Sequence, residues 1–304
     1  MNILITGANG FLGSNLTEKL LKENHCIYAL SVNDYNLKRF NNLKFDSTKL
    51  ENITSLKQNI LAFKPEVIIH CAWNGGNAHR DINSIKQFDN VAHSLDLLKI
   101  LTELDDLYFI CMGSMSEYGI KNYKTNEETI ETPNSLYGIS KYALKMYSEQ
   151  ICRENNFKWL WIRPSYVYGA NDVKTRLIPK TIINCLKNED LTLNSCDSCV
   201  DYIYIEDFIN GVYRLIENKS QGVYNICSSK EYGVKDIVET IHKLSNSSSS
   251  ILFDSSLDRK NFSNYICGDN NKIYHEINWT PKIKINEGLS KTINFLRGEK
   301  NVRQ

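Results

Sequence analysis

The sequence predicts an α/β protein that combines a doubly wound parallel sheet with a smaller α+β lobe. Strand-like and helix-like segments alternate through the first half of the chain, which is typical of a parallel sheet covered by helices on both faces. The first strand-like run, residues 3–5, is short and apolar and leads directly into a glycine-rich turn. After about Asn171 the alternation loosens into helices separated by short strands and polar loops. We therefore expect one lobe over residues 1–170 and a second over residues 171–304, with some segments of the second returning to the sheet.

The expected elements follow one another along the chain. Apolar runs that are too short for helices predict strands at residues 3–5, 27–30, 67–71, 108–112 and 159–162. Apolar residues at helical spacing predict helices between them at residues 11–22, 53–63, 88–104 and 137–154. In the second lobe the predicted helices cover residues 177–187, 205–217, 234–244 and 287–296. The stretch 245–250 is almost entirely serine and asparagine, and we expect a surface loop there.

Three glycines join the first predicted strand to the first predicted helix. Gly7 permits a tight turn, Gly10 lets the backbone approach a pyrophosphate, and Gly13 lets the helix pack closely on the strand. The phosphates of a dinucleotide would lie at the positive N-terminus of the helix. The loop therefore predicts a Rossmann nucleotide-binding domain, and the alternative interpretation is a glycine-rich turn without a ligand. The residues expected to contact the cofactor here are Gly7, Asn9, Gly10, Phe11, Leu12 and Gly13.

Composition excludes several classes of function. The formal net charge is +1 and no basic run is present, so nucleic acid is not an expected partner. No apolar stretch approaches a membrane span, and the N-terminus enters a strand at once without a signal peptide, which favours a cytoplasmic protein without membrane contact. The 9 cysteines are odd in number and scattered, as expected for reduced thiols. Cys196 and Cys199 form a C-x-x-C pair without two further ligands at similar spacing, so we expect no metal site.

A tyrosine and a lysine lie one helical turn apart at the start of the predicted helix 137–154. Tyr137 and Lys141 therefore share one face of that helix. A neighbouring lysine is expected to lower the pKa of the phenol and to favour the phenolate. Ser114 follows the predicted strand 108–112, at the strand ends where such sheets bind ligands. The three residues predict an acid/base centre, and the alternative interpretation is a surface tyrosine and lysine without a catalytic role.

Motifs along nearly the whole chain resemble those of the extended short-chain dehydrogenase/reductase family, the nucleotide-sugar epimerases and dehydratases. The resemblance rests on the segments 6–13 (TGANGFLG), 113–119 (GSMSEYG), 137–141 (YGISK), 163–169 (RPSYVYG), 200–207 (VDYIYIED), 222–226 (GVYNI) and 279–281 (WTP). It implies an NAD(P)-binding Rossmann domain in residues 1–170 and a nucleotide-sugar lobe in residues 171–304. It also implies a homodimer formed through the helices 88–104 and 137–154.

The resemblance implies roles for individual residues. Tyr137 is the general acid/base at the sugar hydroxyl or carbonyl, Lys141 binds the nicotinamide ribose and tunes Tyr137, and Ser114 hydrogen-bonds the reacting oxygen. The further residues implied at the cofactor are Ser31, Arg39, Asp46, Ser47, Cys71, Ala72, Trp73, Asn90, Pro164 and Val167. The residues implied at the substrate are Trp73, Arg80, Ser114, Ser116, Tyr166 and Arg176. Trp73 is unusual at its position, where it either shapes the sugar pocket or packs in the core.

The end of the second predicted strand bears on the choice of cofactor. NAD-preferring relatives place an aspartate there to accept hydrogen bonds from the adenosine ribose, whereas this chain has Ser31. Without that carboxylate a 2′-phosphate is not repelled, and Ser31 is able to donate to it, with Lys38 or Arg39 nearby. The sequence therefore favours NADP(H) over NAD(H). The alternative is that Ser31 only caps a turn and that the protein accepts both cofactors.

Departures from the family pattern separate the possible reactions. Related 4,6-dehydratases carry Thr-Asp-Glu where this chain has Ser114, Met115 and Ser116, so the acid that eliminates water is missing. Related 3,5-epimerase/reductases of the GDP-fucose type use a cysteine at Ser116 and a histidine near Asn171, and the residues present here are poor proton shuttles at neutral pH. Two reactions remain, which are reduction of a 4-keto-6-deoxy sugar by NADPH and 4-epimerisation with tightly held NAD.

Two further departures concern the substrate. Tyr166 replaces the family's asparagine and suggests a rebuilt pocket, and Val200 replaces the arginine that usually meets the diphosphate. Losing that contact costs about 1.5–3 kcal/mol of binding. Arg176 or Arg80 is expected to compensate, and for Arg80 the alternative is a solvated charge.

We therefore expect an NADPH-dependent reductase of a nucleotide-linked 4-keto-6-deoxyhexose. TDP and CDP are the expected nucleotides, as in the branch of the family that makes deoxysugars for surface polysaccharides such as lipopolysaccharide O-antigen. One alternative is a nucleotide-sugar 4-epimerase with tightly bound NAD. Another, from a different class, is a non-catalytic NADP-binding regulator, which would be expected to lack the tyrosine or the lysine.

Overall fold

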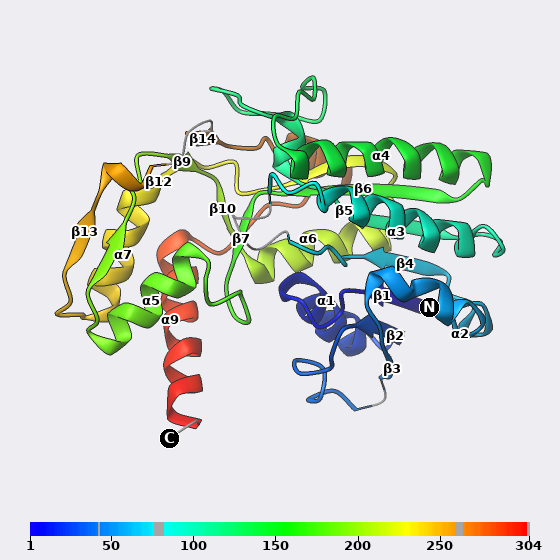
Figure 1. Ribbon diagram of the computed structural model, residues 1–304, viewed down its shortest axis with the longest axis horizontal. Helices are drawn as coiled ribbons and strands as arrows, with labels where there is room; N and C mark the ends of the chain where they lie inside the picture. The colour runs from blue at the N-terminus through cyan, green and yellow to red at the C-terminus, as the bar shows by residue number, and fades with distance from the viewer. Residues whose placement is uncertain (42, 76–81, 259–263, 303–304) are drawn as a thin grey trace.

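A twisted parallel sheet forms the centre of the molecule (Figure 1). The computed structural model describes residues 1–41, 43–75, 82–258 and 264–302. Within these ranges the sheet has seven strands, in the order β11-β6-β5-β4-β1-β2-β3. Their bounds are β1 Asn2–Thr6, β2 Cys26–Ser31, β3 Lys44–Ser47, β4 Val67–His70, β5 Tyr108–Met112, β6 Lys158–Pro164 and β11 Gly222–Ile226. The strand order reverses between β1 and β4, which is the switch point of a doubly wound sheet, so the predicted fold class is confirmed.

The two faces of the sheet carry separate halves of the core. The covering helices are α1 (Phe11–Lys22), α3 (Gln87–Leu101), α4 (Leu136–Glu154) and α6 (Ile205–Glu217). Side chains alternate along β1, so that Ile3 and Ile5 pack on the side of α1 and α6, and Leu4 on the side of α3 and α4 (Figure 1). Both faces are thus buried, which explains why the strands are apolar throughout instead of alternating with polar residues.

The second lobe is built from short strands and three longer helices. The helices are α5 (Leu177–Lys187), α7 (Val234–Ser245) and α9 (Ile285–Val302), with the shorter α8 (Asn271–Ile277). The strands pair in small sheets and are β7 (Tyr166–Tyr168), β8 (Leu191–Leu193), β9 (Cys199–Val200), β10 (Tyr202–Tyr204), β12 (Tyr232–Gly233), β13 (Ile251–Phe253) and β14 (Tyr265–Ile266). Between these elements the chain returns to the central sheet, where α6 packs beside α1 and β11 pairs in parallel with β6.

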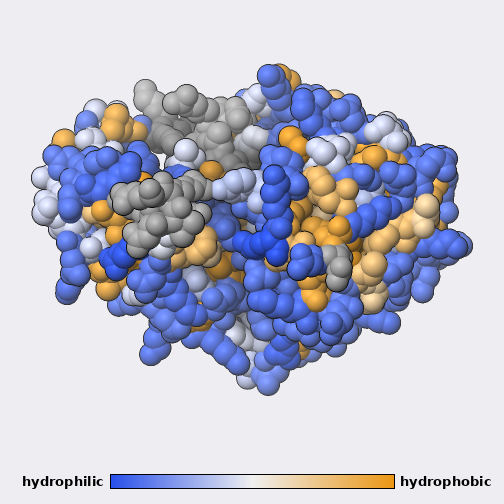
Figure 2. Space-filling view, turned by 90° about the horizontal axis from the view of Figure 1, so that it is seen from below, coloured by the Kyte–Doolittle hydropathy of each residue, from blue (hydrophilic) through white to orange (hydrophobic). Residues whose placement is uncertain are grey.

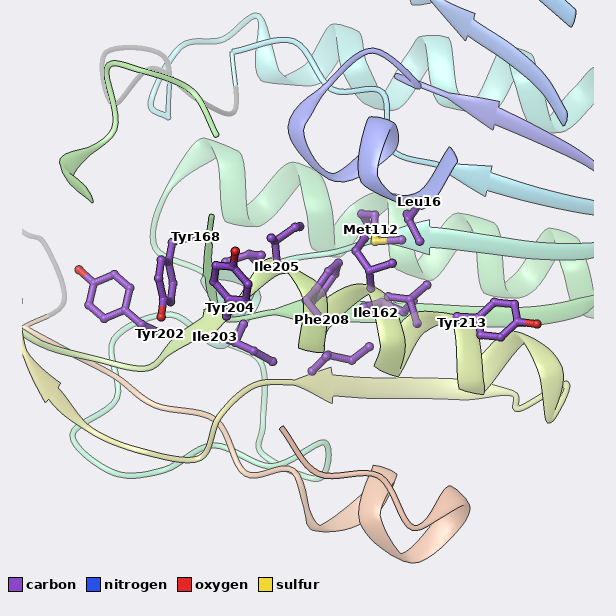
Figure 3. Close-up of a cluster of buried hydrophobic side chains, with 14 of the residues drawn as sticks. Leu16, Met112, Ile162, Tyr168, Tyr202, Ile203, Tyr204, Ile205, Phe208 and Tyr213 are labelled. Carbon is purple, nitrogen blue, oxygen red and sulfur yellow. The ribbon is translucent and has the colours of Figure 1, made fainter. Parts of the chain in front are cut away.

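Tyrosines join the second lobe to the sheet. Tyr168 of β7 lies edge-on against Tyr204 and Tyr202 of β10, with ring centroids 5.5 Å and 6.2 Å apart (Figure 3). The three rings belong to the same buried cluster as Ile162 of β6 and Phe208 of α6. Aromatic pairs in this geometry add to the free energy of burial. The lobe is therefore attached through a continuous apolar core.

Some predicted elements differ from the observed ones. The helix expected over residues 53–63 is two elements, a 3-10 helix η1 (Leu50–Leu56) and a short α-helix α2 (Lys57–Phe63). Ser55 donates its hydroxyl to the carbonyl of Asn52, a local bond that competes with regular α-helix. Strand β3 was not expected, because it is a short edge strand with polar residues. The helices predicted at residues 177–187 and 205–217 have those bounds in the structure.

The surface and the metal-ligating residues give two further observations. In the described part of the chain no helix combines the length and the apolar character needed to cross a membrane. The face drawn in Figure 2 is mostly hydrophilic, with smaller hydrophobic patches between the polar atoms. Within the described ranges, no three His, Cys, Asp or Glu side chains come together in a way that would hold a metal ion.

Candidate functional site

The glycine loop lies between β1 and α1 and has no room for larger side chains. Gly7 has a φ of +66°, and a Cβ there would lie 2.7 Å from the backbone nitrogen of Ala72. A Cβ on Gly13 would overlap the carbonyl oxygen of Gly7. Gly10 precedes α1, whose first turn has no acidic residue and, among the described residues, no side-chain cap. The amides at the start of α1 are therefore available to an anion, and the loop fits the pyrophosphate of a dinucleotide.

Asn9 connects this loop to the segment after β2. Its Nδ2 donates to Asn33 Oδ1 at 2.6 Å, and its Oδ1 accepts from the backbone N–H of Asn36 at 2.6 Å. Phe11 and Leu12, which begin α1, are partly buried against the core. The loop is thus held by the same segment that would surround the adenosine.

Ser31 is the last residue of β2, as predicted, and no carboxylate replaces it at that position. The two basic residues after it are paired with acids. Arg39 Nη2 lies 2.8 Å from Glu18 Oε2 of α1, and Lys38 Nζ lies 3.7 Å from Asp34 Oδ1. Both basic side chains are exposed, so the structure brings neither of them to Ser31 by a direct contact that is described.

A polar hollow of about 490 Å³ opens beside the ends of β2 and β3. It is lined by Val32, Ser47, Thr48, Lys49, Asn52, Thr54 and Ser55. Ser47 donates its hydroxyl to the carbonyl of Val32 at 2.8 Å. Asp46 accepts from the hydroxyl of Tyr28 and from Asn59 Nδ2, so its carboxylate is already engaged within the protein.

The structure brings Ser114, Tyr137 and Lys141 together at the carboxyl end of the sheet. Ser114 follows β5 and begins the 3-10 helix η2 (Met115–Tyr118), and Tyr137 lies in the first turn of α4. The side chain of Ser114 lies close enough to the phenol of Tyr137 to lower its pKa. Lys141 Nζ donates to the carbonyl of Met112 at 2.7 Å and lies 6.0 Å from the centre of the Tyr137 ring.

Burial dominates the ionisation of Tyr137. It raises the pKa of the phenol to about 12, and the carboxylate of Glu117 adds to the rise. The hydrogen bond with Ser114 and the positive charge of Arg176 act in the opposite direction and are weaker. The expectation that Lys141 lowers the pKa of this phenol is wrong for this structure, because the lysine amine is turned toward a backbone carbonyl of β5. Tyr137 is therefore a proton donor at neutral pH.

Burial has the opposite effect on the lysine. Lys141 is only 4% exposed, and burial lowers its pKa to about 8, while Cys111 and Glu117 partly oppose the shift. The amine is therefore mostly protonated at neutral pH and close to its titration range.

Trp73 forms a wall beside these residues. Its ring centre lies 3.6 Å from Lys141 Nζ and 6.0 Å from the ring centre of Tyr137. Its indole N–H donates to Gln87 Oε1 at 2.8 Å, which holds the ring in place. Asn90 of α3 accepts from the backbone N–H of Asn74 at 2.8 Å and so fixes the turn after Trp73. Cation–π contact favours the protonated form of the lysine.

The other predicted cofactor residues lie near the strand ends. Cys71 and Ala72 follow β4, and burial raises the pKa of the Cys71 thiol to about 12, so it is not a nucleophile at neutral pH. Pro164 ends β6, and Val167 lies in β7, paired with Ile203.

The substrate residues that the structure describes come from both lobes. Tyr166 packs edge-on against Tyr202, with ring centres 5.8 Å apart, and influences the ionisation of Tyr137. Arg176 precedes α5, and its Nη1 lies 3.0 Å from Asp172 Oδ1. Its positive charge lowers the pKa of Tyr137.

Ser116 and Arg80 complete the predicted substrate set. Ser116 donates its backbone N–H to Ser114 Oγ at 3.1 Å and is partly exposed. Arg80 lies outside the described residues. Val200 is buried in the core of the second lobe, where no diphosphate contact would be expected from it.

Two residues at the site were not anticipated. Gln87 orients Trp73, and Glu117 accepts from the backbone N–H of Ser114 at 2.7 Å. Glu117 lies in the segment 113–119 that carries the resemblance. Its ion-pair partner is Arg163, which lies far along the chain, so the residues around Glu117 do not indicate the pairing.

Comparisons with known proteins show the family of the chain. The sequence profile of the NAD dependent epimerase/dehydratase family matches residues 3–227. The chain is 25% identical to CDP-abequose synthase of Salmonella muenchen over 299 residues, 96% of this chain and 97% of that protein. It is also 25% identical to dTDP-4-dehydro-6-deoxyglucose reductase of Escherichia coli over 316 residues, 97% of each.

The fold has a close counterpart among solved structures. The UDP-glucose 4-epimerase of Thermotoga maritima, solved with UDP-glucose, superposes with a TM-score of 0.89 at 23% identity, covering 99% of this chain and 100% of that one. The family profile covers the glycine loop, Ser114, Tyr137 and Lys141, and nearly all of the central sheet. The chain therefore belongs to the NAD dependent epimerase/dehydratase family, a family of NAD(P)-dependent enzymes that modify nucleotide sugars.

Proposed function

We propose that this protein reduces the carbonyl of a nucleotide-linked 4-keto-6-deoxyhexose with NADPH, in the synthesis of a sugar for surface polysaccharides. The observation that carries the proposal is the partly buried phenol of Tyr137, which interacts with Ser114 and keeps its proton at neutral pH. A phenol that keeps its proton is suited to protonating a carbonyl oxygen as that oxygen becomes a hydroxyl. Ser116 stands at the position of the dehydratase glutamate, so the acid needed for elimination of water is absent there.

Each residue of the site has its own role in this reduction. Ser114 donates a hydrogen bond to the carbonyl oxygen and orients it toward Tyr137. Tyr137 then gives its proton to that oxygen. The positive charge of Arg176, which lowers the pKa of Tyr137, favours the phenolate that remains, whereas the amine of Lys141, protonated below about pH 8, lies 6.0 Å from the centre of the ring. The glycine loop and Lys141 would hold NADPH, which when bound supplies the hydride to the carbonyl carbon.

The preference for NADP(H) rests on the end of β2. Ser31 stands where a carboxylate would repel a 2′-phosphate, and the neighbouring hollow is lined by serine and threonine residues and by Lys49, whose amine lies 3.4 Å from Glu51 Oε1. We expect Ser31→Asp to weaken NADPH binding by about 10-fold, or about 1.4 kcal/mol, and Ser31→Ala to change it much less. Fluorescence titration gives both dissociation constants. Equal affinity of the wild-type protein for NADPH and NADH would contradict the preference.

The substrate preference rests on Arg176 and on the relatives. Val200 is buried, and Arg176 is a cation whose charge lowers the pKa of Tyr137. A guanidinium suits a diphosphate because it makes paired, charge-assisted hydrogen bonds. The names of the two curated relatives include CDP and dTDP, which supports these two nucleotides.

A homodimer through α3 and α4 is part of the proposal. These helices pack side by side and expose apolar residues, with Phe88 65%, Met146 49% and Tyr147 55% exposed. Burial of such residues is a common driving force for association. We expect light scattering to give the mass of a dimer for the wild type and of a monomer for Phe88→Asp.

The central test supplies the protein with NADPH and TDP- or CDP-4-keto-6-deoxyglucose and follows the absorbance of NADPH. We expect oxidation by the wild type and a loss of at least ~100-fold in kcat for Tyr137→Phe. Tyr147→Phe, on the exposed side of the same helix, is the matched control and is expected to leave kcat unchanged. Absence of NADPH oxidation by the wild type would contradict the proposal, and a product formed without net oxidation would indicate 4-epimerisation instead.

A further inference from the structure

A buried carboxylate lies directly beneath the catalytic serine and has no part in the reaction described above. The side chain of Glu117 is 0% exposed. Its Oε1 accepts from the backbone N–H of Ser114 at 2.7 Å and from the indole N–H of Trp161 at 3.0 Å. Ser114 Oγ in turn accepts from the backbone of Ser116, which closes a capping box at the start of η2. The backbone of Ser114 is therefore held by a charged, buried acceptor.

The charge of Glu117 is balanced by an arginine from the next strand. Arg163 of β6 is also 0% exposed, and its Nε donates to Glu117 Oε2 at 2.8 Å. The guanidinium lies 4.4 Å from the centre of the Tyr118 ring. Burial opposes the charge on Arg163, but its acidic partners outweigh burial and raise the pKa of the guanidinium. A buried pair of this kind is expensive to form and costs still more when one partner is removed.

The ion pair continues to the helix that carries the other catalytic residues. Arg163 Nη2 donates to Glu131 Oε1 at 2.7 Å, and Lys145 Nζ donates to the same oxygen at 2.7 Å. Burial opposes ionisation of Glu131, but the hydrogen bonds from Lys145 and Arg163 outweigh it and lower the pKa of the carboxyl to about 2. Lys145 follows Tyr137 and Lys141 along one face of α4, at successive intervals of one helical turn.

The backbone around Ser114 is shaped to accept this arrangement. A Cβ on Gly113 would overlap the indole nitrogen of Trp161 and would lie 2.5 Å from Glu117 Oε1. Only glycine therefore allows the carboxylate to reach the amide of the next residue. The tight fit leaves Ser114 little freedom to shift relative to β5 and β6.

We propose that Glu117, Arg163, Glu131 and Lys145 form an ionic bracket that positions Ser114 against Tyr137 and Lys141. The bracket joins the loop after β5, the strand β6 and the helix α4, which are the three elements that the catalytic residues occupy or contact. The four residues act as positioning residues, since none of them is assigned a contact with substrate or cofactor. This inference rests on the proposed function, because it takes the catalytic roles of Ser114 and Tyr137 from there.

The bracket also sets the electrostatic environment of the phenol. The groups that act on Tyr137 are Glu117 and Tyr166, which raise its pKa together with burial, and Ser114 and Arg176, which lower it. Removing the negative charge of Glu117 removes one of the groups that raise the pKa of the phenol. The pKa of Tyr137 should therefore fall in a variant that has an amide at position 117.

The test compares Glu117→Gln with Glu128→Gln, an exposed carboxylate of the segment between η2 and α4. With NADPH and TDP- or CDP-4-keto-6-deoxyglucose we expect Glu117→Gln to lower kcat by about 10- to 100-fold with KM changed by less than about 3-fold. The control should retain the wild-type kcat. A change confined to KM, or an unchanged kcat, would overturn the proposal.

Two further measurements keep the proposal testable if Glu117→Gln does not fold. Glu131→Gln removes a partly exposed member of the bracket and is the milder change, so it is expected to fold and to lower kcat by about 3- to 10-fold. If Glu117→Gln does not fold, the kcat of Glu131→Gln decides. NMR of protein labelled with carbon-13 tyrosine, with the Tyr137 signal assigned by its absence in Tyr137→Phe, follows the pKa of the phenol without any sugar.

The NMR measurement separates this inference from the proposed function. A lower pKa of Tyr137 in Glu117→Gln but not in Glu128→Gln supports the bracket even if the wild type reduces neither keto sugar. An unchanged pKa together with wild-type kcat in Glu131→Gln would refute it. Failure of the wild type to oxidise NADPH concerns the proposed function alone.

Discussion

Two arginines near the candidate site differ in their burial. We call the buried region around Arg163 the floor of the site and the partly exposed region around Arg176 its rim. On the floor, Arg163 is 0% exposed and lies between Glu117 and Glu131. On the rim, Arg176 is 28% exposed and has one described acidic partner, Asp172. The first guanidinium is surrounded by protein, whereas the second is partly exposed to solvent. The comparison teaches that two residues with the same charge have different roles. A buried arginine pairs with acids inside the protein and stabilises their positions, whereas a partly exposed one is available to bind a ligand.

This difference separates two kinds of experimental effect. Changes to the floor should alter the stability of the fold and the rate of the chemical step. Changes to the rim should alter substrate binding and leave the chemical step nearly intact. Three predictions test that division, in order of decreasing expected effect.

The largest effect is expected for the floor arginine. Arg163→Met leaves the buried carboxylate of Glu117 without its counter-charge and should lower the free energy of unfolding by about 3–5 kcal/mol. Urea denaturation measures the loss. Arg153→Met, on the exposed surface of α4, is the control and should change stability by no more than about 0.5 kcal/mol. Equal effects of the two substitutions would remove the distinction between floor and surface.

The second effect concerns the buried amine of the floor. Burial lowers the pKa of Lys141 from 10.5 to about 8. Below about pH 8 the amine is charged in the folded and the unfolded chain, so the folded protein bears the full cost of burying the charge. Between about pH 8 and 10.5 only the unfolded chain keeps the proton, and the contribution of Lys141 to the free energy of unfolding therefore rises with pH.

This pH dependence is visible in a pair of proteins. Relative to Lys141→Met, the wild type should gain up to about 3 kcal/mol of stability as the pH is raised across that window. Urea titrations of both proteins at several pH values measure the difference. Lys180→Met, which replaces an exposed lysine of α5, is the control for the loss of a positive charge at the surface. A pH-independent difference for Lys141→Met would show that burial does not shift this amine.

The smallest effect is expected at the rim. Arg176→Ala should raise KM for the nucleotide sugar by about 10- to 100-fold, equivalent to about 1.5–3 kcal/mol, because a charge-assisted contact with the diphosphate is lost. Its kcat should fall by less than about 3-fold. Steady-state kinetics with NADPH and the keto sugar give both constants. A loss confined to kcat would indicate that Arg176 acts on the chemical step and not on substrate binding.

The parts of the structure that depend on local signals were predictable from the sequence. The glycine loop and α1 could be predicted because an apolar strand, three glycines and a helical repeat follow one another without interruption. Strand β3 could not, because its four residues are stabilised by pairing with β2 and carry no apolar pattern of their own. Burial also reversed the expected direction of the pKa shift of Tyr137, since sequence spacing does not reveal desolvation.

The candidate site divides in the same way. Ser114, Tyr137 and Lys141 were found from motifs, and their mutual approach follows from the order of the strands. The pairing of Glu117 with Arg163 has no local signal, because the two residues meet only when β5 and β6 lie side by side. The contact of Trp73 with Lys141 is of the same kind.

Strand β11 has a consequence for the synthesis of the protein. It is the neighbour of β6 on one side, yet it is made only after β7, α5 and α6 have left the ribosome. Until then one hydrogen-bonding edge of β6, with the large apolar rings of Trp159 and Trp161, has no partner strand. Unpaired apolar edges are prone to aggregate. Nascent chains that stall before residue 222 are therefore expected in complexes with chaperones. The order of the strands leaves the growing chain prone to aggregation until β11 is complete at Ile226.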